Sequence, residues 1–129
     1  MSAIVALTRC SNYSFPEIMS ALEKLLSYIG GISSFVRKGQ TVLLKPNLLS
    51  AKAPDEAVTT HPEIVRGLIR LIKRQGANPI VADSVASAVD IEQVWKKTGF
   101  FSLCAQESVP LINLEKSPSR QYEIRGISF

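Results

Sequence analysis

Seven polar residues stand where an α/β protein places its chemistry, directly after apolar runs or at the start of a helical stretch. They are Lys45, Asn47, Thr59, Thr60, His61, Asp83 and Ser84. In an open parallel sheet, ligands bind beyond the carboxyl ends of the strands, and helix N-termini point free N–H groups toward the same edge. We therefore expect these side chains to face one crevice, with Arg9, Cys10 and Asn113 near the ends of other strands.

The residue types in this set suit a small anionic ligand. Lys45 would neutralise negative charge beside the positive end of a helix dipole. The neutral amide and hydroxyls of the set would bind the ligand through hydrogen bonds. His61 and Asp83 would transfer protons, so they are the predicted catalytic residues. Each residue also has an ordinary structural alternative, as a surface lysine, a turn residue or a helix cap.

Short β-rich runs alternate with helical periodicity along the chain. Strands are predicted at residues 3–8, 41–44, 79–82 and 109–114, with a final edge strand at 122–127. Helices are predicted to begin at capping boxes, Ser14 with Glu17 and Thr60 with Glu63, and a third at Asp90. This order predicts a Rossmann-like α/β fold, a three-layer sandwich with a mostly parallel sheet of four to five strands. We interpret residues 1–129 as a single α/β domain and an incomplete portion of a larger one.

Composition narrows the function classes. The net charge is +4 over 129 residues, but the basic residues are scattered, which argues against a nucleic-acid partner. The two cysteines are far apart and the chain has one histidine, so no metal site is predicted. No apolar run is long enough for a membrane span or preceded by a basic region, which predicts a cytoplasmic protein without a membrane partner. The glycine-rich nucleotide motifs and the G-x-S-x-G hydrolase motif are absent from the sequence.

Two motifs carry a family resemblance. The run Lys-Pro-Asn-Leu-Leu at 45–49 and the run Thr-Thr-His-Pro at 59–62, followed by Asp83 and Ser84, resemble the DUF362 family, a domain of unknown function. The resemblance implies an iron–sulfur-associated protein. This chain lacks the four thiolates of a [4Fe–4S] cluster, so a longer form or a partner chain would have to supply them. Where the family commonly has Asp-Ser-Pro-Gly, this chain has Val85 and Ala86 after Asp83 and Ser84.

Two functions remain open at this point. The first is an enzyme or redox-protein part that binds a small anion at the carboxyl edge of the sheet. The second is a non-catalytic assembly or interaction module with a degenerate site, which would form a homo-oligomer or bind a partner chain. The second follows because an incomplete parallel sheet exposes a strand edge and an apolar face.

Overall fold

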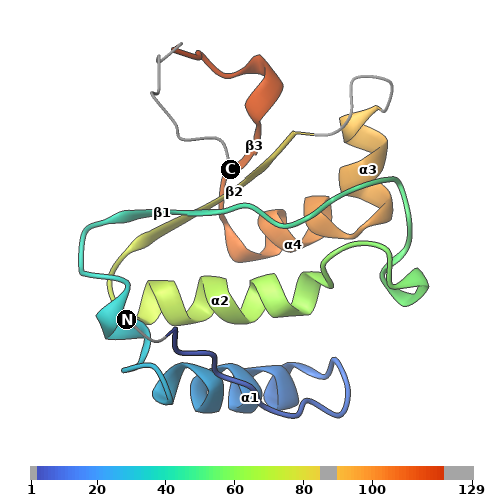
Figure 1. The fold of residues 1–129 in the computed structure, drawn as a ribbon. Coiled ribbons are helices and arrows are strands. Elements are labelled where there is room, and N and C mark those ends of the chain that lie inside the picture. The colour runs from blue at the N-terminus through green and yellow to red at the C-terminus, as the bar shows by residue number, and fades with distance from the viewer. Residues whose placement is uncertain (1–2, 85–89, 121–129) are drawn as a thin grey trace, which may run out of the picture.

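The computed structural model describes residues 3–84 and 90–120. Its helices and strands alternate along the chain, except that two helices follow each other between the second and third strands (Figure 1). They are α1 Phe15–Ser27, β1 Thr41–Leu44, α2 Pro62–Arg74, β2 Asn78–Asp83, α3 Ile91–Lys97, α4 Phe100–Glu107 and β3 Leu111–Asn113. Three short 3₁₀ segments, η1 Ile32–Ser34, η2 Pro54–Glu56 and η3 Leu114–Lys116, lie in the connections.

The strands form one parallel sheet in the order β1-β2-β3. Leu44 is the partner of Val81, and Val81 is the partner of Leu111. The central strand β2 reads as a nearly continuous apolar run, and Pro79, Val81, Ala82 and Asp83 within it are buried, as is typical of parallel strands. The α/β class with a parallel sheet is confirmed, although the described residues form three strands where four to five were predicted.

The predicted strand at residues 3–8 is wrong for this structure. These residues form no strand, and their large apolar side chains Ile4, Val5 and Leu7 are 79–83% exposed. A strand requires an edge to pair with, and local β propensity does not supply one. The predicted strand at 122–127 lies outside the described residues.

The first helix begins differently from its prediction. Ser14 is the N-cap residue of α1, but its side chain makes no capping hydrogen bond. Glu17 accepts a hydrogen bond from the backbone N–H of Ser11 instead. The predicted capping box is therefore wrong, because the preceding loop folds back far enough for Glu17 to reach beyond the cap.

Helix α1 packs mainly against α2, through a glycine. A Cβ atom at Gly67 would lie 2.5 Å from Leu22 Cδ1 and 3.1 Å from Ile18 Cγ2. The absence of a side chain at this position lets the two helices approach closely. In Figure 1, α2 and α4 lie on the same side of the strands, and α1 lies beyond α2.

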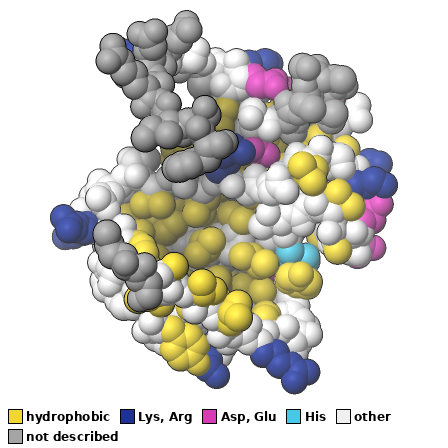
Figure 2. Space-filling view, viewed as in Figure 1, with side chains coloured by type: hydrophobic (Ala, Val, Ile, Leu, Met, Phe, Trp, Pro, Cys, Tyr) yellow, Lys and Arg dark blue, Asp and Glu magenta, His cyan; other side chains and the backbone are white. Residues whose placement is uncertain are grey.

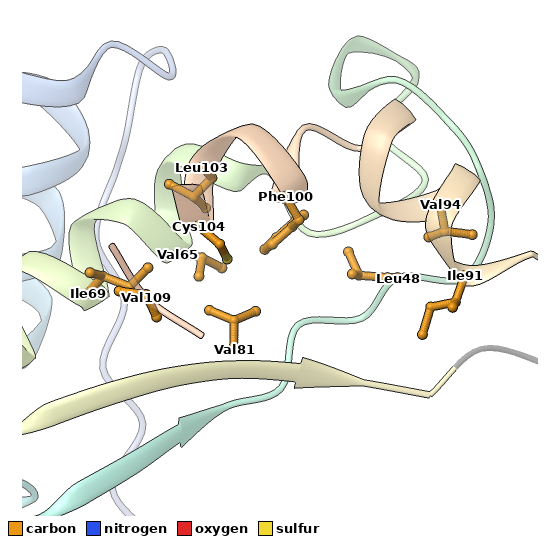
Figure 3. Packing of buried hydrophobic residues seen from close by; sticks show 10 residues of the cluster. All are labelled: Leu48, Val65, Ile69, Val81, Ile91, Val94, Phe100, Leu103, Cys104 and Val109. Atoms are coloured by element: carbon orange, nitrogen blue, oxygen red, sulfur yellow. The ribbon is translucent and has the colours of Figure 1, made fainter. Parts of the chain in front are cut away.

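The main core fills the space between β2 and the helices α2, α3 and α4 (Figure 3). Val81 of β2, Ile69 of α2 and Phe100 of α4 are all fully buried there. Burying such side chains contributes about 1.5–3 kcal/mol each. Helix α4 was not predicted from the sequence, yet it supplies Phe100 and Leu103 to this core.

A buried carboxylate joins α2 to α4. Glu107 is 3% exposed, and its carboxylate lies 3.0 Å from a terminal nitrogen of Arg66 and 2.7 Å from Nε of Arg70. Lys73 donates to the Glu107 backbone carbonyl. Two guanidinium groups therefore replace the water that this carboxylate loses on folding.

Candidate functional site

Lys45 and Asp83 meet at the carboxyl ends of β1 and β2. The Lys45 ammonium lies 2.8 Å from Asp83 Oδ1. The two strands are parallel neighbours, so residues that follow one strand lie beside the end of the other. Asp83 is 2% exposed, whereas the Lys45 side chain is 54% exposed. The sequence argument brought these two residues to one edge, and the structure joins them.

The Asp83 carboxylate is held by two groups. Its Oδ2 atom accepts a hydrogen bond from the Leu48 backbone N–H at 3.2 Å. Its Oδ1 atom makes the contact with Lys45, which is an ion pair without the direction of a regular hydrogen bond. The carboxylate thus fixes the turn that carries Lys45 into the following loop. This is a structural use of Asp83, and among the described residues no hydrogen bond or ion pair joins it to His61.

Asn47 and Thr60 form a reciprocal pair that ties the end of β1 to the start of α2. The Asn47 N–H donates to Thr60 Oγ1, and the Thr60 N–H donates to the Asn47 carbonyl, both at 3.1 Å. Thr60 is therefore not the helix cap that the sequence predicted. Beside it, Thr59 Oγ1 is buried and has no hydrogen-bond partner among the described residues.

His61 is the N-cap residue of α2. Its Nδ1 atom accepts a hydrogen bond from the Glu63 N–H at 3.2 Å. Its ring stacks on Tyr13, with centroids 3.7 Å apart and planes 8° apart. Burial lowers the pKa of His61, and the Glu63 carboxylate opposes this shift. The lowered pKa favours the neutral ring, and because Nδ1 accepts the Glu63 N–H, Nε2 is the ring nitrogen left for proton transfer.

A hollow of about 320 Å³ opens beside the Lys45 end of β1. Its lining is mainly apolar, from Leu44, Pro46, Ile64, Val65 and Leu68, and Lys45, Asn47 and Thr60 are its polar lining residues. Two smaller hollows, of about 200 and 240 Å³, lie on the other side of Ile64 and are lined in part by Cys10 and Ile18. Figure 2 shows a broad cluster of hydrophobic side chains on one face, with the histidine at its border.

The remaining candidates lie apart from this hollow. Ser84 and Arg9 are exposed and line none of the three hollows. Asn113 caps η3 by accepting from the Glu115 N–H. Cys10 is exposed, and its thiol donates to the Asn12 carbonyl.

Three contributors to the site were missed from the sequence. They are the Leu48 N–H, the Tyr13 ring and the apolar wall formed by Ile64 and Leu68. None of the three carried a local signal for its contact, because Tyr13 precedes the N-cap of α1 but stacks on the N-cap residue of α2, which is distant in the sequence.

Within residues 3–84 and 90–120, no group of three or more His, Cys, Asp or Glu side chains is arranged to hold a metal ion. None of the helices described in those ranges is both long and apolar enough to cross a bilayer.

Comparison with known proteins bears on the family. The model of the domain of unknown function DUF362 matches residues 42–129, which begin within β1 and include the Lys45 turn, α2 and Asp83. This chain belongs to the DUF362 family. The resemblance based on the two motifs is thereby confirmed, whereas the family's iron–sulfur association is not tested by the match.

One curated relative of this DUF362 chain is the thylakoid-associated protein sll1697 of Synechocystis sp. The two are 32% identical over 108 residues, which cover 84% of this chain and 33% of the relative. The chain therefore spans about a third of the length of that protein. No solved structure matches this DUF362 chain.

Proposed function

We propose that this chain binds a small ligand with one anionic group on an apolar body, in the hollow between the end of β1 and the start of α2. The observation that carries the proposal is that the half-exposed side chain of Lys45 is among the residues that line a mainly apolar hollow of about 320 Å³. Ligand sites are commonly apolar pockets of about 300–1,000 Å³ with a few placed polar groups.

The electrostatics favour a singly charged group, such as a carboxylate. An ammonium has three N–H donors. One donor of Lys45 faces Asp83, and the other two are left for a ligand. The negative charge of Asp83 also weakens the attraction of Lys45 for an anionic ligand. Glu63 in the first turn of α2 reduces the positive potential of that helix end. A highly charged phosphate ester would therefore gain little here.

The apolar residues that line the hollow indicate the chemistry of the rest of the ligand. Leu44, Ile64 and Leu68 are partly exposed along the hollow, so covering them with a hydrocarbon body removes apolar surface from water. The hollow's volume of about 320 Å³ lies at the lower end of the range for ligand pockets, so it suits a short hydrocarbon chain. Octanoate is the probe that we choose for this chemistry.

Titration with octanoate, followed by amide chemical shifts, tests the proposal. We expect saturable shifts at Lys45, Thr60 and Ile64, and weaker binding of neutral 1-octanol. Lys45→Met combined with Asp83→Asn removes the cation without leaving a buried charge, and it should abolish the preference for octanoate over octanol.

Lys52→Met is the matched control, because Lys52 is also half exposed and pairs with a carboxylate, that of Glu56, at 2.9 Å. Equal octanoate affinity in the wild type and in the Lys45 double variant would refute the proposal.

Catalysis by His61 and Asp83 stays a prediction. The capping role of His61 and the ion pair of Asp83 give both residues structural uses, so binding is the better-supported function.

A [4Fe–4S] cluster in a longer form or a partner chain likewise stays a proposal, based on the family resemblance. Electron paramagnetic resonance of this chain, purified from cells with any bound partner and then reduced, tests it.

A second candidate function is assembly with another chain. Figure 2 shows the hydrophobic cluster that favours it, and β1 lies at an edge of the sheet. Light scattering tests for a dimer.

The name of the Synechocystis relative describes that protein as thylakoid-associated. A cytoplasmic location remains the prediction for this chain, and cell fractionation followed by detection of this chain distinguishes the two.

A further inference from the structure

The segment of residues 3–8 has the composition of a buried strand but lies in solvent. Its large side chains Ile4, Val5 and Leu7 are 79%, 79% and 83% exposed. Such a run of β-branched and apolar residues gains stability only when it is covered and paired. The segment is therefore an apolar element without a partner in the described structure.

The outer edge of β1 is an open place for a strand. Order β1-β2-β3 leaves β1 paired on one side only. Leu43 of β1 is 50% exposed. An edge strand presents a row of backbone N–H and C=O groups that can pair with a further strand.

The apolar surface between this edge and the segment is continuous. The hollow beside β1 is lined by Leu44, Ile64 and Leu68, and the hollow beside the segment is lined by Thr8, Leu22 and, again, Ile64. One side chain thus separates the two hollows. Figure 2 shows the same face as a broad hydrophobic area.

We propose that residues 3–8 of this chain dock on the outer edge of β1 as a fourth parallel strand. Figure 1 shows the segment and β1 running in the same direction, and α1, which follows the segment in the chain, running in the opposite direction. Strand, α1 and β1 would then form a βαβ unit that repeats the sense of the existing unit β1, α2 and β2. Both units advance the same way across the sheet with their helices on the same side, so they share one handedness, as parallel crossovers do.

The connection permits this movement. Tyr13 is already anchored on His61 at the start of α2, and Thr60 next to it is bonded to Asn47 just beyond β1. Residues 9–12 connect the anchored Tyr13 to the segment, and four extended residues reach up to about 14 Å. The helix α1 can keep its contact at Gly67 while the segment moves.

Docking would add two residues to the rim of the hollow. If Thr8 aligns with Leu44, then Arg9 lies beside Lys45, and Cys10 follows it. Two cations would then face the single Asp83 carboxylate, which strengthens the attraction for an anionic group. This consequence rests on the proposed function, whereas the docking itself does not.

Disulfide trapping tests the docking without any ligand. In a Cys10→Ser background, we introduce Leu7→Cys with Leu43→Cys, which the alignment makes neighbours. Adjacent strands lie about 4.8 Å apart, within the Cα separation that a disulfide requires. Cys104 stays in place because it is buried, and burial raises the pKa of its thiol to about 11. Leu7→Cys with Phe101→Cys, two exposed positions on different elements, is the control.

We expect an intramolecular disulfide in the 7/43 variant and none in the 7/101 variant. A disulfide between two chains would overturn the proposal by showing that a second copy supplies the strand. Equal trapping in both variants, or none in either, would also overturn it. As a second measurement, deletion of residues 1–8 should lower the hydrogen-exchange protection of the β1 amides about tenfold or more, and unchanged protection counts against docking.

The ligand arm uses Arg9→Gln, with octanoate as the probe. We expect about 3- to 10-fold weaker binding, as for the loss of one charged hydrogen bond near solvent. If the 7/43 disulfide forms and the wild type binds no octanoate, the proposed function fails while docking stands. If octanoate binds and no disulfide forms, the docking fails alone.

Discussion

Removing Lys45 and removing the charge of Asp83 should lower the free energy of unfolding by different amounts. Lys45→Met leaves the Asp83 carboxylate 2% exposed and without its counter-ion. Removing one partner of a fully buried pair costs about 3–5 kcal/mol. Because the Lys45 side chain is 54% exposed, water replaces part of its effect, and we expect about 1–2 kcal/mol here.

Asp83→Asn should have a smaller effect. The amide oxygen can still accept the Leu48 N–H, so only the ion pair with a half-exposed lysine is lost. Such pairs contribute about 0–1 kcal/mol. Asp83→Ala removes the acceptor too, and leaving the Leu48 N–H unpaired in a buried position costs about 1–3 kcal/mol.

Urea denaturation of the single variants and the double variant is the assay. The free energy of unfolding should fall further in Lys45→Met than in Asp83→Asn. Adding Asp83→Asn to Lys45→Met should restore most of the free energy that Lys45→Met loses. A double variant as unstable as Lys45→Met alone, or a neutral Lys45→Met, would refute the role assigned to the buried carboxylate.

Three further predictions concern the scaffold. Glu107→Gln should destabilise by about 2–4 kcal/mol in urea denaturation, because two arginines lose the carboxylate they share, and a change under 0.5 kcal/mol, the ordinary scatter of surface substitutions, would contradict this. Gly67→Val should separate α1 from α2 and lower the melting temperature, whereas an unchanged melting temperature would show that the helix pair yields without cost. Because the pKa of His61 is lowered on folding, the unfolded chain binds more protons, so stability should fall as pH drops below about 6.5. His61→Asn retains a capping side chain, and it should flatten that slope between about pH 7.5 and pH 5.5.

Much of the local structure is determined by the sequence alone. The strand at 41–44 matches β1, the strand at 79–82 falls within β2, and Asp90 caps α3 as expected, by accepting from the Glu92 N–H. These features rest on apolar runs, turn residues and caps that act over a few neighbours. The two motifs at 45–49 and 59–62 were sufficient for the family.

The tertiary structure decided which of these residues act together. Lys45 and Asp83 pair because two parallel strands end side by side, and strand order decides which ends are neighbours. His61 rather than Thr60 became the cap, because Thr60 bonds to Asn47 across the loop. Helix α4 begins directly after Gly99 without a polar cap, so local signals indicated only that the preceding helix stops there. Burial of Phe100 and Leu103 against β2 and α2 stabilises α4, and that burial depends on contacts distant in the sequence.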